Sequence, residues 1–254
     1  MNKSILLCEP KYFEISYEIN PWMDIDNGVN HQLAVEQWHN FHNKLKEFIQ
    51  VELIDPRPDL PDMVFTANAG LPLLDSNKVV LSNFTHGVRK GEEVWFRKWF
   101  LENGFEVVDS DVNFEGAGDA LYLKDQLITG YGFRSKYSAL ISRIGVKLLD
   151  PRFYHLDTCF CPLRDHYLIY EKAFSSESVL LLKNLNLGEP IPVDEDEALR
   201  FACNAVVVNN AVFIPNGCPK TVANLQQLNY DVFQFEMSEF MKSGGSCKCL
   251  TLQI

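Results

Sequence analysis

The sequence predicts an α/β fold, a five-bladed β/α propeller in which a ββαβ unit occurs five times with pseudo-fivefold symmetry. Two observations support this class. Pairs of short apolar strands joined by polar turns recur along the chain, with equivalent points roughly 40 to 50 residues apart. A helical pattern and a further short strand accompany each pair. Because no linker, charge block or low-complexity segment divides the chain, we expect residues 1–254 to form a single domain.

The predicted hairpins consist of two β-rich runs around a polar turn. In the first, at 63–84, the strands 71–74 and 79–81 flank a turn at 75–78. Three more follow, at 119–131, 157–170 and 204–215. The last strand, expected within 247–254, has no partner after it. The apolar run 4–9 is therefore expected to pair with it and close the ring.

Helical spacing of apolar residues predicts the connections between the hairpins. We expect helices at 31–50, 90–104, 133–145, 175–187 and 220–228. Short strands are expected after them at 51–54, 106–108, 146–149, 191–193 and 231–235. Each helix would thus carry the chain from a hairpin to the third strand of its unit.

The formal charge of −11 and the sequence pI near 5.0 argue against nucleic-acid binding, which needs a basic surface. An acidic protein is compatible with a small cationic substrate, although acidity also serves solubility alone. The apolar run at the N-terminus is too short for a signal peptide, and no window approaches a membrane span. We expect a cytoplasmic protein that does not interact with membranes.

Seven cysteines without a CxxC pair do not suggest a disulfide framework in a chain of this length. Two CxC pairs, Cys159 with Cys161 and Cys247 with Cys249, would each put both sulfur atoms on one strand face. Structural zinc is therefore an alternative to be weighed. The missing two-residue spacer and the lack of a paired-histidine motif argue against it, so no metal or other cofactor is expected.

The segments that enter the hairpins would converge at one end of a closed ring, where polar side chains could form a site. Asn68 enters the first hairpin, and its simplest interpretation is a turn cap. Glu115 and Asp119 flank two glycines at the second. They are equally compatible with a solvated turn and with two acids that hold a cation.

The third and fifth entrances carry a potential base and nucleophile. His155 and Asp157 would share one strand face, so the carboxylate could orient the imidazole. Cys249 is our candidate nucleophile, but Cys247 has the same facing and strand alternation cannot choose between them. Lys248 would face away, which makes His155 the better group to activate the thiol.

Six short motifs span nearly the whole chain, at 19–23, 61–68, 114–119, 130–134, 155–158 and 248–251. In this order they resemble the guanidine-modifying enzyme superfamily, also called the amidinotransferase or pentein fold. It includes arginine deiminases, dimethylarginine dimethylaminohydrolases and amidinotransferases, and the chain looks most similar to its arginine dihydrolase group.

The resemblance implies a role for each candidate residue. It places the nucleophile at Cys249 and the general acid/base at His155, with Glu115 beside it. The remaining candidates are implied to bind substrate. Asp119 and Asp157 would lie at the guanidinium end, Asn68 would contact the reacting group, and the amino-acid end would be held by Asn20, Arg89 and Arg134.

The implied activity is hydrolysis of the guanidinium C–N bond of arginine through a cysteine-linked intermediate, without a cofactor. Typical deiminases have Asp where Asn68 stands, and an amide can hold a guanidinium or a neutral ureido group. This difference favours an arginine dihydrolase, which forms ornithine, ammonia and carbon dioxide. The alternatives are a dimethylarginine hydrolase, an arginine deiminase that releases citrulline, and a non-catalytic pentein binding module. The sequence is also compatible with a homo-oligomer and leaves the oligomeric state open.

Overall fold

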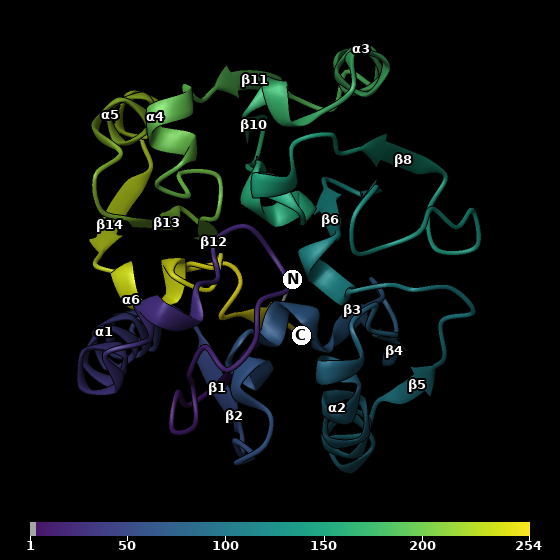
Figure 1. Cartoon of the computed structure of the whole chain (residues 1–254). Helices are drawn as coiled ribbons and strands as arrows, with labels where there is room; N and C mark the ends of the chain where they lie inside the picture. The colour runs from purple at the N-terminus through teal and green to yellow at the C-terminus, as the bar shows by residue number, and fades with distance from the viewer. Residues whose placement is uncertain (1–3) are drawn as a thin grey trace.

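The computed structural model describes residues 4–254, which form five three-stranded sheets arranged around a ring (Figure 1). In each sheet the middle strand pairs antiparallel with one neighbour and parallel with the other. Four sheets are built from consecutive strands. They are β3 (Gly70–Pro72), β4 (Lys78–Leu81) and β5 (Glu106–Val108); β6 (Ala120–Leu123), β7 (Gln126–Tyr131) and β8 (Ile144–Lys147); β9 (Phe160–Pro162), β10 (His166–Ile169) and β11 (Glu189–Pro192); and β12 (Val206–Val208), β13 (Ala211–Pro215) and β14 (Asp231–Phe235).

The fifth sheet joins the two ends of the chain, as the sequence predicts. It has the order β15 (Leu252–Gln253), β1 (Ser4–Cys8) and β2 (Gln50–Ile54). In β1, Leu6 lies opposite Leu252, and Ser4 exchanges two backbone hydrogen bonds with Ile254 at 2.9 and 3.1 Å. The predicted hairpins, their closure and the five-unit propeller are thus confirmed.

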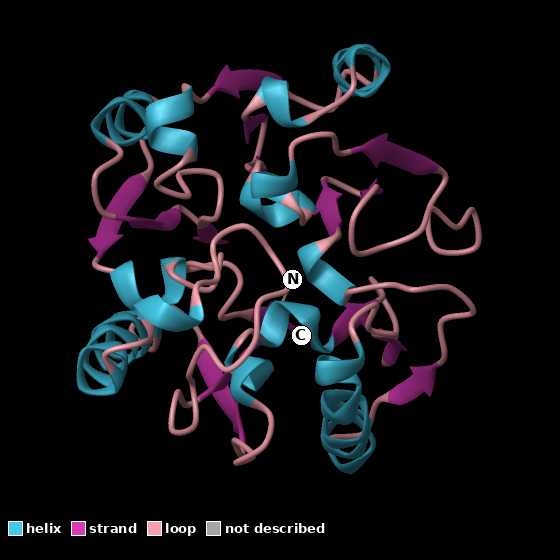
Figure 2. Ribbon diagram, viewed as in Figure 1, coloured by secondary structure: helices cyan, strands magenta, loops and turns pink. Residues whose placement is uncertain are grey.

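The longer helices lie at the outer edge of the ring, and short helical turns lie near its centre (Figure 2). The helices are α1 (His31–Leu45), α2 (Lys90–Glu102), α3 (Ser176–Asn184), α4 (Glu195–Ala198), α5 (Pro219–Gln227) and α6 (Ser238–Met241). Local signals start three of them, because Asn30 caps α1, Ser175 caps α3 and Asp194 caps α4 through side-chain hydrogen bonds. The longer helices bury one face against their sheets, as Phe96 and Phe100 of α2 do. None of the helices within 4–254 is both long and apolar enough to cross a membrane.

The predicted helix at 133–145 is wrong, since the chain there forms bends and turns instead. Its serines bond elsewhere, and such side chains compete with helical backbone bonding. Ser135 Oγ contacts Asp119 at 2.6 Å, and Ser142 Oγ contacts the carbonyl of Leu127 at 2.5 Å. The adjacent Arg134 is also buried in the ring. The apolar spacing of this segment therefore does not reflect a helix.

Tight turns, rather than extended strands, lead into the innermost strands. The 3-10 turns Thr66–Ala69, Gly116–Gly118 and Leu156–Thr158 come just before β3, β6 and β9, and neighbouring turns contact each other. Residues 247–250 likewise form a turn before β15. The strand facings expected for the segments around His155 and Cys249 are therefore wrong. Because these turns gather near the ring axis, polar residues from distant segments meet there.

Candidate active site

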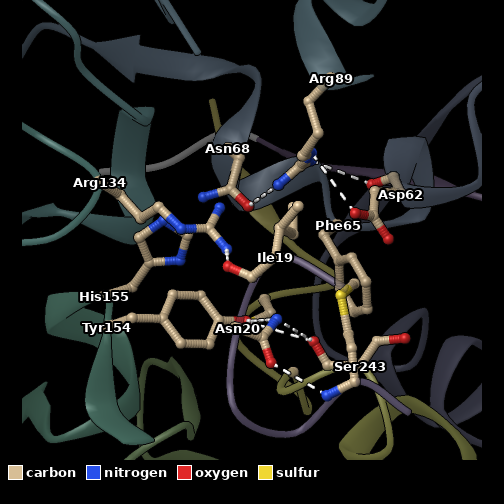
Figure 3. Close-up of a pocket in the computed structure, with 13 residues that line it drawn as sticks. Ile19, Asn20, Asp62, Phe65, Asn68, Arg89, Arg134, Tyr154, His155 and Ser243 are labelled. Atoms are coloured by element: carbon tan, nitrogen blue, oxygen red, sulfur yellow. Dashed lines mark hydrogen bonds and ion pairs between the residues drawn. The ribbon is translucent and has the colours of Figure 1, made fainter. Parts of the chain in front are cut away.

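The turns surround a buried pocket with a free volume of only about 10 Å³, close to that of one water molecule (Figure 3). Its walls combine cationic, acidic, amide and aromatic side chains. They are Ile19, Asn20, Met23, Asp62, Phe65, Asn68, Arg89, Arg134, Tyr154, His155, Ser243, Gly245 and Cys249. Charges of both signs in so small a pocket suit a zwitterionic ligand better than an apolar one.

His155 is held by a carboxylate from the second entrance. Its Nε2 lies 2.8 Å from Oε2 of Glu115, and that oxygen also accepts a hydrogen bond from Arg134 at 3.1 Å. Burial would raise the pKa of Glu115, but the hydrogen bond from His155 and the charge of Arg134 outweigh it and keep this pKa below its usual range. Glu115 is therefore an anion that can stabilise a protonated His155.

Asp119 lies behind the imidazole and not in the pocket wall. Its carboxylate accepts hydrogen bonds from Ser135 Oγ at 2.6 Å and from the backbone N–H of Leu156 at 3.0 Å. Its Oδ2 is 3.9 Å from Nε2 of His155. Burial raises its pKa to about 6. Asp119 thus braces the third entrance against the second.

Cys249 lines the pocket, and its sulfur contacts polar groups from two other entrances. Sγ lies 3.5 Å from Oδ2 of Asp157, and it accepts a hydrogen bond from Nδ2 of Asn204 at 3.1 Å. Burial and the carboxylate of Asp157 raise the pKa of this thiol, while Asn204 and Lys248 lower it. Lys248 therefore does influence the thiol, although the sequence suggested that it would face away.

Asn68 has a fixed orientation between two neighbours. Its Nδ2 donates to the carbonyl of Glu115 at 3.0 Å, and its Oδ1 accepts from Arg89 at 3.0 Å (Figure 3). Gly118 leaves the space that the Asn68 side chain occupies, because a Cβ at position 118 would lie only 2.4 Å from Nδ2 of Asn68. Arg89 in turn forms a two-pronged ion pair with Glu92, with both contacts at 2.8 Å.

Asp62 is a pocket residue that the sequence analysis missed. Its Oδ2 accepts a hydrogen bond from Tyr17 at 3.0 Å, whereas Oδ1 is buried with no hydrogen-bond partner among the described residues. Burial raises its pKa, and the charge of Arg89 opposes that effect. A buried acceptor of this kind suits a cationic ligand group. In the sequence Asp62 is only part of a turn, and nothing local marks it.

Asn20 and Arg134 secure the segment that covers the pocket. Asn20 donates to Tyr154 Oη at 3.2 Å and to the carbonyl of Ser243 at 3.0 Å. Arg134 donates to the carbonyl of Ile19 at 2.9 Å, and its guanidinium lies 4.6 Å from the centroid of the Tyr154 ring.

The residues predicted for the site fall into two groups. Those in the pocket wall are Asn20, Asn68, Arg89, Arg134, His155 and Cys249. Glu115, Asp119 and Asp157 stand behind the wall and contact its members. The expected pairing of His155 with Asp157 is wrong: these residues lie at the start and in the middle of a turn, and the carboxylate bonded to His155 is that of Glu115.

The described residues contain no group of three or more His, Cys, Asp or Glu side chains that could hold a metal ion. This statement includes the two CxC segments that the sequence offered as an alternative zinc site.

Comparison with known proteins relates most of the chain to guanidine-modifying enzymes. Residues 9–254 match the family model described as eukaryotic N,N dimethylarginine dimethylhydrolase. The chain is 43% identical to the bifunctional arginine dihydrolase/ornithine cyclodeaminase ArgZ of a Synechocystis species, over 98% of this chain and 37% of that protein. It is 35% identical to the N(G),N(G)-dimethylarginine dimethylaminohydrolase of Mycobacterium tuberculosis, over 98% of this chain and 84% of that one.

The similarity extends to three-dimensional structure. The N-terminal domain of an ArgZ variant, covalently bound to a reaction intermediate, superposes with a TM-score of 0.93 at 41% identity, covering 98% of this chain and 97% of that domain. The chain therefore spans only about a third of the full length of ArgZ, the part that this domain represents.

Proposed function

The chain belongs to the N,N dimethylarginine dimethylhydrolase family of guanidine-modifying enzymes, and on this premise we propose that it is a hydrolase acting on the guanidinium group of arginine. The relative with 43% identity is named an arginine dihydrolase, which favours arginine as the substrate and ornithine as the product. The observation that carries the proposal is the meeting of Cys249 and His155 in one pocket that also contains opposite charges.

Those charges can hold the amino-acid end of arginine. The free Oδ1 of Asp62 can accept hydrogen bonds from the α-ammonium group. Within the described residues Arg134 uses only two of its five N–H donors, so it retains donors for the α-carboxylate. Arg89 is more heavily engaged, by Glu92 and Asn68, and would act chiefly by fixing the pocket. Asn20 would hold the cover over this end of the substrate.

The guanidinium would then lie beside Cys249 and Asp157. Its positive charge offsets the effect of burial and of the Asp157 carboxylate, both of which disfavour the thiolate before substrate binds. The thiolate attacks the central guanidinium carbon, and His155 protonates the departing ammonia. Glu115 stabilises the protonated imidazole that this transfer requires. Acid/base assistance of this kind is worth ~10² to 10⁴ in rate.

Hydrolysis completes the cycle. Water deprotonated by His155 attacks the amidino-thioether and displaces the Cys249 thiolate, leaving a ureido group on the substrate. In a dihydrolase a second round on that group follows, so arginine and two waters yield ornithine, carbon dioxide and two ammonia molecules. The amide of Asn68 contains both a donor and an acceptor and can contact a charged guanidinium or a neutral ureido group.

Incubation of the protein with arginine, citrulline and dimethylarginine, followed by product identification by mass, tests the proposal. We expect arginine to give ornithine and ammonia. Failure to transform any of the three compounds would contradict a hydrolase function altogether.

The Asn68→Asp variant tests the basis of the second hydrolysis. We expect product to shift toward citrulline, because a carboxylate favours the guanidinium cation over the neutral ureido group. The same substitution at the exposed Asn216 is the control and should leave the product ratio unchanged. Equal product ratios in wild type and Asn68→Asp would count against the role of the amide.

A dimethylarginine hydrolase is the second candidate, favoured by the matching family model and by the Mycobacterium tuberculosis relative. The same assay separates the two functions, since preferential release of a methylated amine would identify a dimethylarginine hydrolase.

We further propose that residues 1–254 act as one catalytic domain, because pairing of β1 with β15 joins the ends of the chain. A cytoplasmic location accords with seven free cysteines, which a reducing compartment maintains.

A further inference from the structure

We propose that Asn204, which enters the fourth sheet of the ring, is a positioning residue that orients Cys249 and stabilises its thiolate. The inference rests on the proposed role of Cys249 as nucleophile. It adds a fourth-entrance residue to a site for which the sequence suggested contributions from the other four entrances only.

The hydrogen bonds of Asn204 determine the orientation of its amide. Its Oδ1 accepts from two backbone N–H groups, those of Lys248 at 3.0 Å and Cys249 at 3.2 Å. A flipped amide would direct its NH₂ group at these donors, which is unfavourable. Nδ2 must therefore point the other way, toward Sγ of Cys249 at 3.1 Å and the carbonyl of Asp157 at 2.9 Å. Every strong hydrogen-bonding position of this side chain is thus directed at the nucleophile and its surroundings.

The position of Asn204 in the ring makes this arrangement rigid. The residue is completely buried, and its own backbone carbonyl accepts a further hydrogen bond from the N–H of Lys248 at 3.1 Å. It lies between the third entrance, which carries Asp157, and the fifth, which carries Cys249. One side chain therefore sets the separation between the sulfur atom and the neighbouring acid.

The hydrogen bond from Nδ2 of Asn204 to Sγ of Cys249 also affects the ionisation of the thiol. The thiol can donate its proton to Asp157, but a thiolate can only accept, so the N–H group of Asn204 favours the ionised form. The charged groups facing Sγ are Asp157, which opposes ionisation, and Lys248, which favours it. The phenol of Tyr154 also interacts with the charge of Cys249. Asn204 is the neutral donor in this set.

The test measures alkylation of Cys249 by iodoacetamide, located by peptide mass spectrometry, from about pH 6 to about pH 10 in the absence of substrate. In Asn204→Ala we expect the rate at neutral pH to fall about tenfold, since hydrogen bonds to charged groups are about twice as strong as neutral ones. The pH midpoint of alkylation should rise at the same time. A thiol with a higher pKa is intrinsically more nucleophilic, so the midpoint is the more direct readout.

Asn204→Asp removes the donor to sulfur while keeping an acceptor for the turn. This variant has the same shape and retains an oxygen for the N–H groups of Lys248 and Cys249, but lacks the NH₂ group. We expect it to fold, with slow alkylation and a raised midpoint above the pH at which the new carboxyl ionises. A wild-type midpoint in this variant would overturn the proposal, because the lost donor and the new carboxylate both disfavour the thiolate.

Asn216→Ala, the same change on an exposed position of the same unit, is the control and should match wild type. Thermal unfolding of each variant shows whether it is folded, and the Asp variant decides the matter if the Ala variant is not. Because no substrate is involved, loss of thiolate stabilisation is seen even if arginine is not the substrate. Alkylation of Asn204→Ala with a wild-type midpoint would refute the inference while leaving the proposed function intact.

Discussion

The two cysteines of the C-terminal turn differ in what surrounds their sulfur atoms. Both pack in the same apolar cluster, but Cys249 lines the pocket and contacts Asn204 and Asp157, whereas Cys247 does not line the pocket. We therefore expect Cys249→Ser to abolish turnover, since a serine hydroxyl is far harder to ionise. Cys247→Ser should retain most of the activity, with stability lowered by about 1 to 3 kcal/mol for a buried hydroxyl.

Steady-state kinetics of both variants, with unfolding curves for each, make the comparison. Cys247→Ser serves as the matched control for the same atomic change two residues away. An active Cys249→Ser enzyme beside an inactive, folded Cys247→Ser enzyme would reverse the assignment of the nucleophile.

Asp157 gives a pH-dependent contribution to stability whose sign follows from its environment. Burial raises its pKa from 3.8 to about 6, so between these values the folded protein binds more protons than the unfolded chain. Stability contributed by this residue therefore falls as pH rises through that window. The Asp157→Asn variant lacks this titration, and its stability relative to wild type should increase from about pH 4.5 to about pH 7 by about 2 kcal/mol.

Denaturant unfolding at both pH values measures this difference. Asp125→Asn, on the exposed turn between β6 and β7, is the control for loss of an ordinary acid. A relative stability of Asp157→Asn that does not change with pH would show that Asp157 ionises normally in the folded protein.

At the scale of single residues, the sequence predicted most of the polar residues that gather in the pocket but not which atoms meet. Period-two alternation made Cys247 equivalent to Cys249 and paired His155 with Asp157. Only the resemblance to a family favoured Cys249 over Cys247 and set Glu115 beside His155. Both stretches form turns, so alternation did not apply. The bond between His155 and Glu115 joins residues 40 positions apart, and no local pattern encodes such a contact.

Among the elements, the first two entrance turns are packed closely against each other at Gly118. Gly118 in the turn Gly116–Gly118 leaves no room for a Cβ beside Nδ2 of Asn68. Gly118→Ala should therefore displace Asn68 and lose its bond to Glu115. We expect a stability loss of about 1 to 3 kcal/mol and a larger relative loss of activity.

Kinetic assays and unfolding curves on Gly118→Ala check this expectation. Gly28→Ala is the matched control, because nothing lies within 4 Å of a Cβ built there. Wild-type activity in Gly118→Ala would mean that the position of Asn68 is not critical.

Helices and strands followed from local patterns wherever one face of the element is buried. The helix expected at 31–50 lies at His31–Leu45, and the one at 90–104 lies at Lys90–Glu102. Periodicity failed at 133–145 because Arg134 and Ser135 bond to groups of the second entrance instead of following a helical face. Tertiary hydrogen bonds outweighed local preference there.

For the molecule as a whole, the pairing of β1 with β15 is the contact that closes the ring. Deletion of residues 252–254 removes the backbone bonds between Ser4 and Ile254 and the fully buried side chain of Leu252. We expect several kcal/mol of lost stability, of which burial of Leu252 accounts for about 1.5 to 3 kcal/mol. Activity should fall with it, because Thr66 Oγ1 bonds the carbonyl of Leu250 next to the deleted strand at 2.8 Å.

Thermal unfolding of the shortened chain provides the measurement. Gln253→Ala keeps the backbone pairing and loses only a side-chain bond to Val207, so it should be much milder. An unfolding midpoint equal to that of the full chain would mean that closure contributes little. The recurrence of strand pairs made the ring and its closure predictable from sequence, since four complete units leave strands at the two ends of the chain to form the fifth.

This closure also determines the order in which the protein can fold. Four sheets consist of neighbouring segments and can form soon after each is synthesised, whereas β1 must wait for β15 at the far end of the chain. Loop-closure entropy grows only slowly with length, by about 0.6 kcal/mol per doubling, but contacts of such long range form late in folding. Cys249 lies in the turn just before β15, so its sulfur enters the pocket only when β15 docks against β1. The unfinished chain thus has no assembled site in which that thiol could be activated.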